Sequence, residues 1–314
     1  MAADGTKHEI WVDNLLAEYH IRYGGYGGIA YHHVSDTYIA LFSRFIPCGV
    51  WEAVYILEAL LENTSDIQPT EIHADTQGQS YPVFGLAHML GFQLLPRIRN
   101  WADLIFYRSD PTTRYQHIDA LFGDAPKNVI NWNKIETHWA DLMRVVLSVR
   151  AGKISSATLL RKLGNESRKN RLYQAFSEVG KAVRTITLLR YITEPELRAK
   201  TTAATNKAEA FNGYSKWLAF GNAGVITDND PDQQEKIIKF NELEANCLIF
   251  QTALDITRIV RDLTAEGREV DLDDLATITP YQHRQYRRFG DYLVDTTTPE
   301  PIDGHLDLTH TAVG

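Results

Sequence analysis

The sequence predicts an α/β protein with three parts in chain order: a strand-rich front, a basic helical middle and a helical return. Runs of β-branched and aromatic residues in about the first 110 positions predict strands. From about residue 132 onward, apolar residues recur at helical spacing. The composition, 44% hydrophobic and 23% charged, is that of a globular protein, and 314 residues suffice for one large domain or two ordinary ones.

The front is expected to begin with two strands and a helix. Residues 29–34 (IAYHHV) and 38–46 (YIALFSRFI) have the composition of strands, and the glycine-rich segment Gly24–Gly28 marks a turn before them. Apolar residues at helical spacing then predict a helix over about 49–63.

Four shorter elements complete the front. Residues 70–74 predict a short strand that runs into Asp75. A helix is predicted over 82–90 and a second short strand over 93–98, and residues 101–107 are a further strand candidate.

Amphipathic helices are predicted in the remainder, for example over 138–150, 201–219 and 233–263. The middle has the character of an insertion into a compact fold, because the return segment again carries candidate chemistry. We therefore divide the chain into a first core part (1–125), a basic helical insertion (126–200), a helical return (201–295) and a tail (296–314). The tail is rich in Thr, Pro and Asp and is expected to be disordered.

Charge is distributed unevenly along the chain. The net charge of -8 argues by itself against a nucleic-acid partner, because Lys and Arg dominate phosphate binding. Residues 144–200, however, hold 13 basic and 4 acidic residues, so this segment is about +9 and the remainder about -17. Such asymmetry indicates a module that faces a polyanion, and a solvated helical face is the alternative.

The two cysteines, Cys48 and Cys247, cannot form a disulfide framework or a Cys-rich zinc site. No targeting segment is visible, and the most apolar helical stretch, 49–61, is too short to span a bilayer. We therefore expect a cytoplasmic protein.

Three carboxylates are candidates for a divalent-metal site. Asp75 follows the predicted strand 70–74, and loops at strand ends are where α/β folds place reactive groups. Asp4 could end or occupy a first strand at the N-terminus. Asp4 and Asp75 are 71 residues apart, an interval that can hold a hairpin, a third strand and one helix before a fourth strand, and this fourth strand can lie beside the first. Glu209, on the return helix, would complete a site for phosphoryl transfer.

Each of these residues has a structural alternative. Asp75 could cap a turn or a helix, and Asp4 could lie in a disordered terminus. Glu209 could close a capping box with Asn206.

Other motifs weigh less. The segment Gly24–Gly28 matches neither common nucleotide-binding loop. His32 and His33 alternate across a strand and cannot chelate one metal from the same face. His73 shares the strand face of Asp75, where a structural or supporting role is expected.

Basic and polar residues provide candidate DNA contacts. Arg97 and Arg99 alternate on a predicted strand face, and residues 281–288 mix aromatic and basic side chains as nucleic-acid surfaces do. Ordinary surface positions explain them nearly as well. The candidates are Arg97, Arg99, Arg161, Lys162, Arg168, Lys169, Arg171, Asn206, Lys207, Arg287 and Arg288.

Several longer segments resemble one family. They include ADGTK at 3–7, residues 14–49, residues 72–108 with IHADTQGQ at their start, residues 206–246 beginning NKAEAFNGYSKWLAFG, and residues 279–295. In this order, over roughly residues 1–295, the chain resembles the catalytic region of the Tn3 family of bacterial transposases.

The resemblance implies an RNase H-like mixed sheet with a long helical insertion before the last carboxylate. It implies a DDE site in which Asp4, Asp75 and Glu209 are catalytic and bind Mg²⁺, with Mn²⁺ as a substitute. The implied reaction is nicking of transposon ends, followed by attack of the freed 3′-hydroxyl on target DNA in replicative transposition. DNA is the implied partner, and the full-length protein is expected to form a homo-oligomer.

Family transposases carry a long region upstream of this domain that recognises the terminal repeats, whereas here the sequence begins three residues before Asp4. We therefore expect a C-terminal fragment of a transposase. Two alternatives stay open: a non-catalytic DNA-binding or interaction remnant that interferes with a full-length transposase, and an RNA-processing nuclease with the same metal chemistry.

Overall fold

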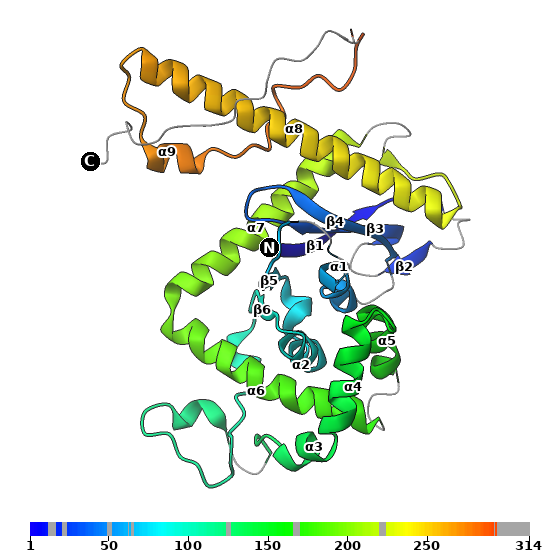
Figure 1. Ribbon diagram of the computed structural model, residues 1–314, viewed down its shortest axis with the longest axis vertical. Helices are drawn as coiled ribbons and strands as arrows, with labels where there is room; N and C mark the ends of the chain where they lie inside the picture. Colours follow the sequence, from blue (N-terminus) through cyan, green and yellow to red (C-terminus); the bar gives the residue numbers. More distant parts are fainter. Residues whose placement is uncertain are drawn as a thin grey trace. The chain divides into compact units, whose positions relative to one another are not determined.

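The computed structural model describes residues 1–11, 17–20, 24–48, 52–61, 63, 66–123, 127–165, 170–219, 224–291 and 293. Over these residues the chain is a mixed α/β protein, as the sequence predicts (Figure 1). It divides into two compact units. The first comprises Met1–Gly5, Tyr31–Asp36 and Gly49–Glu209, and the second comprises Thr6–Ala30, Thr37–Cys48 and Ala210–Gly314.

The sheet of the described residues has six strands. They are β1 (Ala2–His8), β2 (Glu18–His20), β3 (Gly25–Val34), β4 (Ala40–Pro47), β5 (Glu71–Ala74) and β6 (Gln93–Pro96). Their order is β2-β3-β1-β5-β6, with β4 also paired to β3. Strand β5 runs parallel to both β1 and β6, whereas β2 and β3 are antiparallel. The predicted strands at 29–34, 38–46, 70–74 and 93–98 are thus confirmed with shifted ends.

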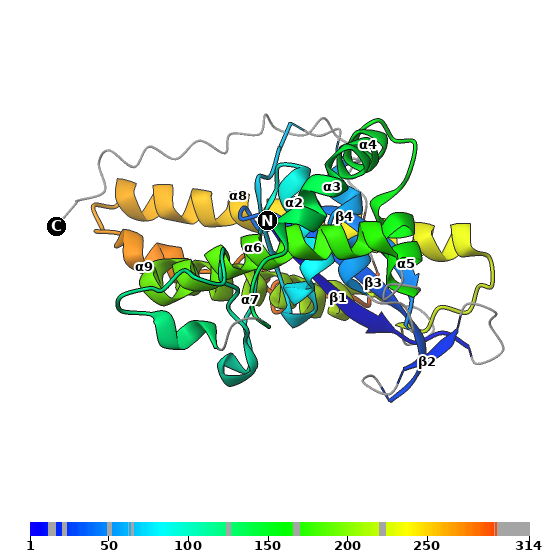
Figure 2. The same cartoon turned by 90° about the horizontal axis from the view of Figure 1, so that it is seen from below.

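From residue 132 onward, the helices of the first unit lie in the region where the sequence predicts amphipathic helices. The described helices of this unit are α1 (Glu58–Leu61), α2 (Tyr81–Met89), α3 (Trp132–Thr137), α4 (Trp139–Arg150), α5 (Ser156–Asn165) and α6 (Arg171–Thr193), together with α7 (Pro195–Leu218) as far as Glu209. Helix α2 is apolar on nearly every side, and its residues Pro82 to Ala87 are all buried. It packs closely against α6 (Figure 1, Figure 2). This helix pair is a main part of the core of the first unit.

Glycines allow α2 and α6 to approach closely. A β-carbon at Gly180 of α6 would lie 1.7 Å from the carbonyl oxygen of Tyr81, and one at Gly85 of α2 would lie 2.3 Å from that of Phe176. No side chain fits at such distances. The two helices therefore meet backbone to backbone at these positions.

Two predictions for the front need correction. The helix predicted over 49–63 is, in its described part, a 3₁₀ turn, η2 (Glu52–Tyr55), followed by the single turn α1. The strand candidate at 101–107 is wrong: Trp101–Asp103 form the 3₁₀ turn η4, and Arg108 makes an isolated parallel bridge with Val129. The apolar residues there serve packing, since Phe106 packs with Phe122 and Leu188.

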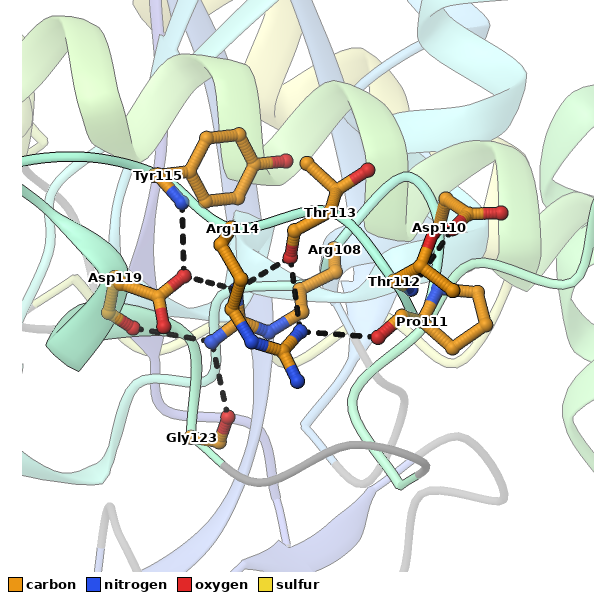
Figure 3. Close-up of polar contacts among 9 residues, drawn as sticks. All are labelled: Arg108, Asp110, Pro111, Thr112, Thr113, Arg114, Tyr115, Asp119 and Gly123. Atoms are coloured by element: carbon orange, nitrogen blue, oxygen red, sulfur yellow. Dashed lines mark hydrogen bonds and ion pairs between the residues drawn. The ribbon is translucent and has the colours of Figure 1, made fainter.

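The loop after residue 107 is organised by a buried arginine (Figure 3). The Arg108 guanidinium is paired with the Asp119 carboxylate and donates to the carbonyl oxygens of Thr113 at 3.1 Å and Gly123 at 3.4 Å. The backbone N–H of Tyr115 also donates to Asp119, at 2.9 Å. The hydrogen bond from Arg108, followed by the one from Tyr115, lowers the pKa of Asp119 to about 2.

In the second unit, α8 (Pro231–Ala265) packs along β4. The Asn246 side chain both donates to the carbonyl oxygen of Ala40, at 2.8 Å, and accepts from its N–H, at 3.0 Å. Arg44 of β4 pairs with Glu235 of α8 at 2.9 Å. After the short helix α9 (Leu272–Thr277), Tyr281 inserts among aromatic rings.

None of the described helices combines the length and the low charge needed to cross a membrane. The predicted disordered tail, 296–314, lies outside the described residues.

Candidate active site

Strand register places Asp4 and Asp75 side by side. In the parallel pair of β1 and β5, Ala2 is opposite His73 and Ala3 is opposite Ala74. Continued by one residue, this register brings the backbones of Asp4 and Asp75 next to each other. Residues at equal register in neighbouring parallel strands project from the same face of a sheet. The neighbouring strands expected from the chain length between these residues are thus confirmed.

The Asp4 carboxyl lies in a negative environment. Its burial, followed by the negative charge of Asp75, raises its pKa from the ordinary 3.8 to about 7, and the charges of Glu52 and Glu209 act in the same direction. A hydrogen bond from the backbone of Gly5 partly offsets them. Four carboxyl groups therefore share one electrostatic field, and a cation would be stabilised within it.

Glu52 is the carboxylate that the sequence analysis missed. It belongs to the 3₁₀ turn η2 and is only 5% exposed, although its neighbours in sequence are an ordinary apolar run. An acidic residue inside a predicted amphipathic helix gives no sign of burial by itself. A buried Glu requires a compensating environment, and this requirement becomes visible only in the fold.

Glu209 lies in the middle of α7, which is fixed to the rest of the first unit at several points. The Tyr191 hydroxyl of α6 donates to the carbonyl oxygen of Pro96 at 3.1 Å and contacts the Thr201 hydroxyl of α7 at 3.3 Å. Lys200 of α7 pairs with Glu71 of β5. Because α7 begins at Pro195, Glu209 is far from the helix start, and the alternative capping box with Asn206 is wrong.

Arg97 connects Glu209 to the edge of the sheet. It follows β6 directly, and its backbone N–H donates to the carbonyl oxygen of Ala74 at 2.8 Å. Its guanidinium Nη1 lies 2.9 Å from Oε1 of Glu209, while Nη2 donates to the side-chain oxygen of Asn206. Since β6 ends at Pro96, Arg97 and Arg99 are not on a strand face, contrary to the sequence prediction.

The carboxylates are near one another without forming a complete metal site. Among the side chains that the structure describes, no three of His, Cys, Asp and Glu are arranged to hold a metal ion together. The donor chemistry still fits a divalent cation, because carboxylate oxygens are the ligands that Mg²⁺ prefers and the field at Asp4 is negative. Glu209 is the member held elsewhere, by Arg97.

His73 and the pair His32 and His33 behave as buried structural residues. All three are at most 2% exposed, and burial lowers the pKa of His73 to about 4. His33 contacts the carbonyl oxygen of Ile56 through Nε2 at 3.2 Å. A neutral His73 on β5 carries no positive charge near neutral pH.

Of the candidate DNA contacts, Arg97 and Asn206 contact each other, and Arg99 is exposed. The other candidates fall into three groups. Arg171, at the start of α6, and Arg287, near the end of the described residues, are exposed. Lys207 and Arg288 are engaged internally: Lys207 donates to the carbonyl oxygen of Asp36, and Arg288 lies 5.0 Å from the ring centre of Trp217. The third group is not described at side-chain level: Arg161 and Lys162 lie on α5, and Arg168 and Lys169 lie outside the described residues.

Much of the positive charge of 144–200 is already paired. Arg144, Lys181, Arg190 and Lys200 pair with the carboxylates of Asp141, Glu178, Glu194 and Glu71, respectively. Arg184 is buried over the ring of Tyr81, at 4.8 Å from its centre. These residues are already engaged within the protein, whether on a solvated helical face, as Arg144 is, or in the core, as Arg184 is.

Comparison with known proteins identifies the class as the DDE domain of transposases. The family model described as Tn3 transposase DDE domain matches residues 1–292. The chain belongs to this family, which confirms the resemblance seen in the sequence.

Curated relatives agree. The transposase for transposon Tn1546 of Enterococcus faecium is 29% identical over 292 residues, which cover 93% of this chain and 29% of the relative. The transposase for transposon Tn501 of Pseudomonas aeruginosa is 30% identical over 267 residues, covering 85% and 27%. The transposase for transposon gamma-delta of Escherichia coli (strain K12) is 29% identical over 303 residues, covering 96% and 30%. The chain thus spans less than a third of the length of these relatives.

Proposed function

We propose that this chain is the catalytic region of a DNA transposase, which nicks transposon ends and joins the freed 3′-hydroxyl to target DNA. One observation carries the proposal: in a chain of this family, the parallel register of β1 with β5 brings Asp4 of β1 opposite Asp75, which directly follows β5. An RNase H-like arrangement of the sheet, with residues 126–200 as an insertion before Glu209, is part of the same proposal.

Asp4, Asp75 and Glu209 are the proposed metal ligands and catalytic residues, with Mg²⁺ as the natural ion and Mn²⁺ as a substitute. When bound, the ions would supply Lewis-acid stabilisation of the attacking and leaving oxygens. The protein contributes by holding three carboxylates from three separate elements around one phosphodiester. Because Asp4 is buried in the fold, part of the competing water is excluded, and the attraction between its carboxylate and a cation is stronger.

DNA is the proposed partner, both as transposon end and as target. The exposed Arg171 and the basic residues at 161–169 are proposed to contact phosphates, and a reaction on chromosomal or plasmid DNA would take place in the bacterial cytoplasm. A homo-oligomer is proposed for the complete transposase, since two transposon ends must be processed together.

The proposal is tested by a nicking and strand-transfer assay. Supercoiled plasmid carrying transposon ends is incubated with the chain in Mg²⁺ or Mn²⁺, and nicked and joined products are measured. We expect Asp75→Ala to reduce the rate by at least about 100-fold, because one ligand of the ions that stabilise the transition state is lost.

Asp141→Asn is the matched control, since it removes an exposed carboxylate that pairs only with a neighbouring arginine on α4. It should retain the wild-type rate. Equal rates for wild type and Asp75→Ala would refute the catalytic proposal. DNA binding without any metal-dependent cleavage would instead support the alternative of a non-catalytic DNA-binding remnant.

A further inference from the structure

The Arg97 side chain forms an ion pair with Glu209, the carboxylate that the proposed metal site needs as its third ligand. Its Nη1 lies 2.9 Å from Oε1 of Glu209, and Nη2 reaches Asn206, three residues earlier on the same face of α7. The planar guanidinium therefore spans one helical turn with two parallel donors. Arg97 is 23% exposed and Glu209 55% exposed, so both can also be reached from outside.

The backbone of Arg97 is fixed beside the other two carboxylates. Its N–H donates to the carbonyl oxygen of Ala74, the residue before Asp75, and its own carbonyl oxygen accepts from the Gln79 side chain at 3.3 Å. In the sheet, β6 neighbours β5, which neighbours β1. Asp75 and Arg97 thus directly follow the parallel strands β5 and β6, and Asp4 lies within the neighbouring parallel strand β1. The Arg97 side chain extends from here to Glu209.

A carboxylate oxygen that is paired with a guanidinium is a poor metal ligand. Arginine does not lose its proton in proteins, so the positive charge stays in place and opposes a cation at the same oxygen. This agrees with the lack of a three-ligand metal arrangement among the described side chains. Glu209 can therefore serve Arg97 or a metal ion, but not both fully.

DNA supplies the competing partner for Arg97. The guanidinium fork matches a phosphate as well as it matches a carboxylate, and it binds either with two parallel hydrogen bonds. An exposed ion pair is weak, at most about fivefold in an equilibrium constant, so a phosphate can displace Glu209 readily.

We propose that Arg97 is a positioning residue that withholds Glu209 from the metal site until a DNA phosphate takes the place of the Glu209 carboxylate. Arg97 thereby couples substrate binding to completion of the metal site. This inference rests on the proposed role of Glu209 as the third carboxylate, and its test must separate the two.

The first measurement is Mn²⁺ affinity of the DNA-free chain, by electron paramagnetic resonance. Arg97→Gln should bind Mn²⁺ about three- to fivefold more tightly than wild type, because Glu209 is released. Lys200→Gln is the matched control: it breaks a second ion pair of α7, with Glu71 at the start of β5, and removes one positive charge. The Mn²⁺ affinity of Lys200→Gln should stay within about twofold of wild type.

The gain must depend on Glu209. In the Glu209→Gln background, the substitution Arg97→Gln should no longer increase the Mn²⁺ affinity. An increase that persists in the double variant, or that Lys200→Gln reproduces, would show a general charge effect and would overturn the inference.

The reciprocal measurement is DNA affinity in metal-free buffer. Glu209→Gln should strengthen binding of a duplex oligonucleotide, and the gain should shrink in the Arg97→Gln background, because the freed guanidinium makes the added phosphate contact. If the effects of the two substitutions on DNA affinity are additive, the proposed replacement of Glu209 by a phosphate at Arg97 is wrong. Failure of the underlying function is recognised separately: if Asp75→Ala leaves Mn²⁺ affinity unchanged in every background, the proposed metal site itself is wrong.

Discussion

At Asp4, burial and neighbouring negative charge act in the same direction. The carboxyl has a pKa near 7 in the folded chain against an ordinary 3.8, with burial as the first cause and Asp75 as the second. The protonated form is therefore the one that the fold favours in the absence of a metal. The contribution of this group to the free energy of unfolding is fully present below about pH 4 and is lost as the pH rises through about 7.

This sign can be measured by urea unfolding of the metal-free chain at several pH values. Between pH 4 and 7 the wild type should lose stability relative to Asp4→Asn, which has no carboxyl to ionise. Glu52→Gln should lower the pKa of Asp4 and shift the loss to lower pH, because it removes one of the charges that raise this pKa. Glu58→Gln, a half-buried position on α1, serves as the control. Parallel stability curves for wild type and Asp4→Asn would contradict the assignment.

At the scale of elements, most strands and the long helices can be predicted from the local sequence, because the composition and spacing of apolar residues within a short segment indicate the type of element. The strand predicted over 101–107 is wrong, since Phe106 is buried by contacts with distant Phe122 and Leu188 and not by strand pairing, whereas Trp101 and Ile105 are exposed. For the site, the pairing of Asp4 with Asp75 could be predicted from element order. The burial of Glu52 and the Arg97–Glu209 pair could not, because both depend on segments more than 40 residues apart.

The contact of α2 with α6 gives a prediction at this scale. Gly180→Ala should destabilise the first unit by about 2–3 kcal/mol, because its β-carbon meets the backbone of Tyr81 and the helices must separate. Gly213→Ala on α7 is the control: its β-carbon meets nothing within 4 Å, so up to about 1 kcal/mol of stabilisation is expected from helix propensity. Urea unfolding monitored by circular dichroism measures both, and equal stabilities of the two variants would contradict the packing.

At the scale of the whole molecule, the net charge of -8 combines a basic segment with an acidic remainder. The structure refines this division, because several basic residues of 144–200 are paired with carboxylates or buried. The positive charge available to a polyanion is therefore smaller than the sequence count.

Salt dependence tests this view. DNA affinity should fall with salt concentration, and reversing Arg161, Lys162 and Arg171 to Glu should weaken binding and reduce the slope of log affinity against log salt by about 2–3. Reversing Lys236, Lys239 and Arg258 on α8 provides a control of equal charge, which should keep more of the slope. A wild-type affinity that does not change with salt would exclude an electrostatic DNA surface in this chain.

The buried Arg108 has a consequence for recognition. Its hydrogen bonds to Thr113, Asp119 and Gly123 shape residues 108–123 from within, so this loop has its conformation before any partner arrives. A preorganised loop loses little conformational entropy on association, and more of its contact energy is retained as affinity. The buried Arg108 thus fixes the loop from within, while neighbours such as Arg114 stay exposed on the preformed loop.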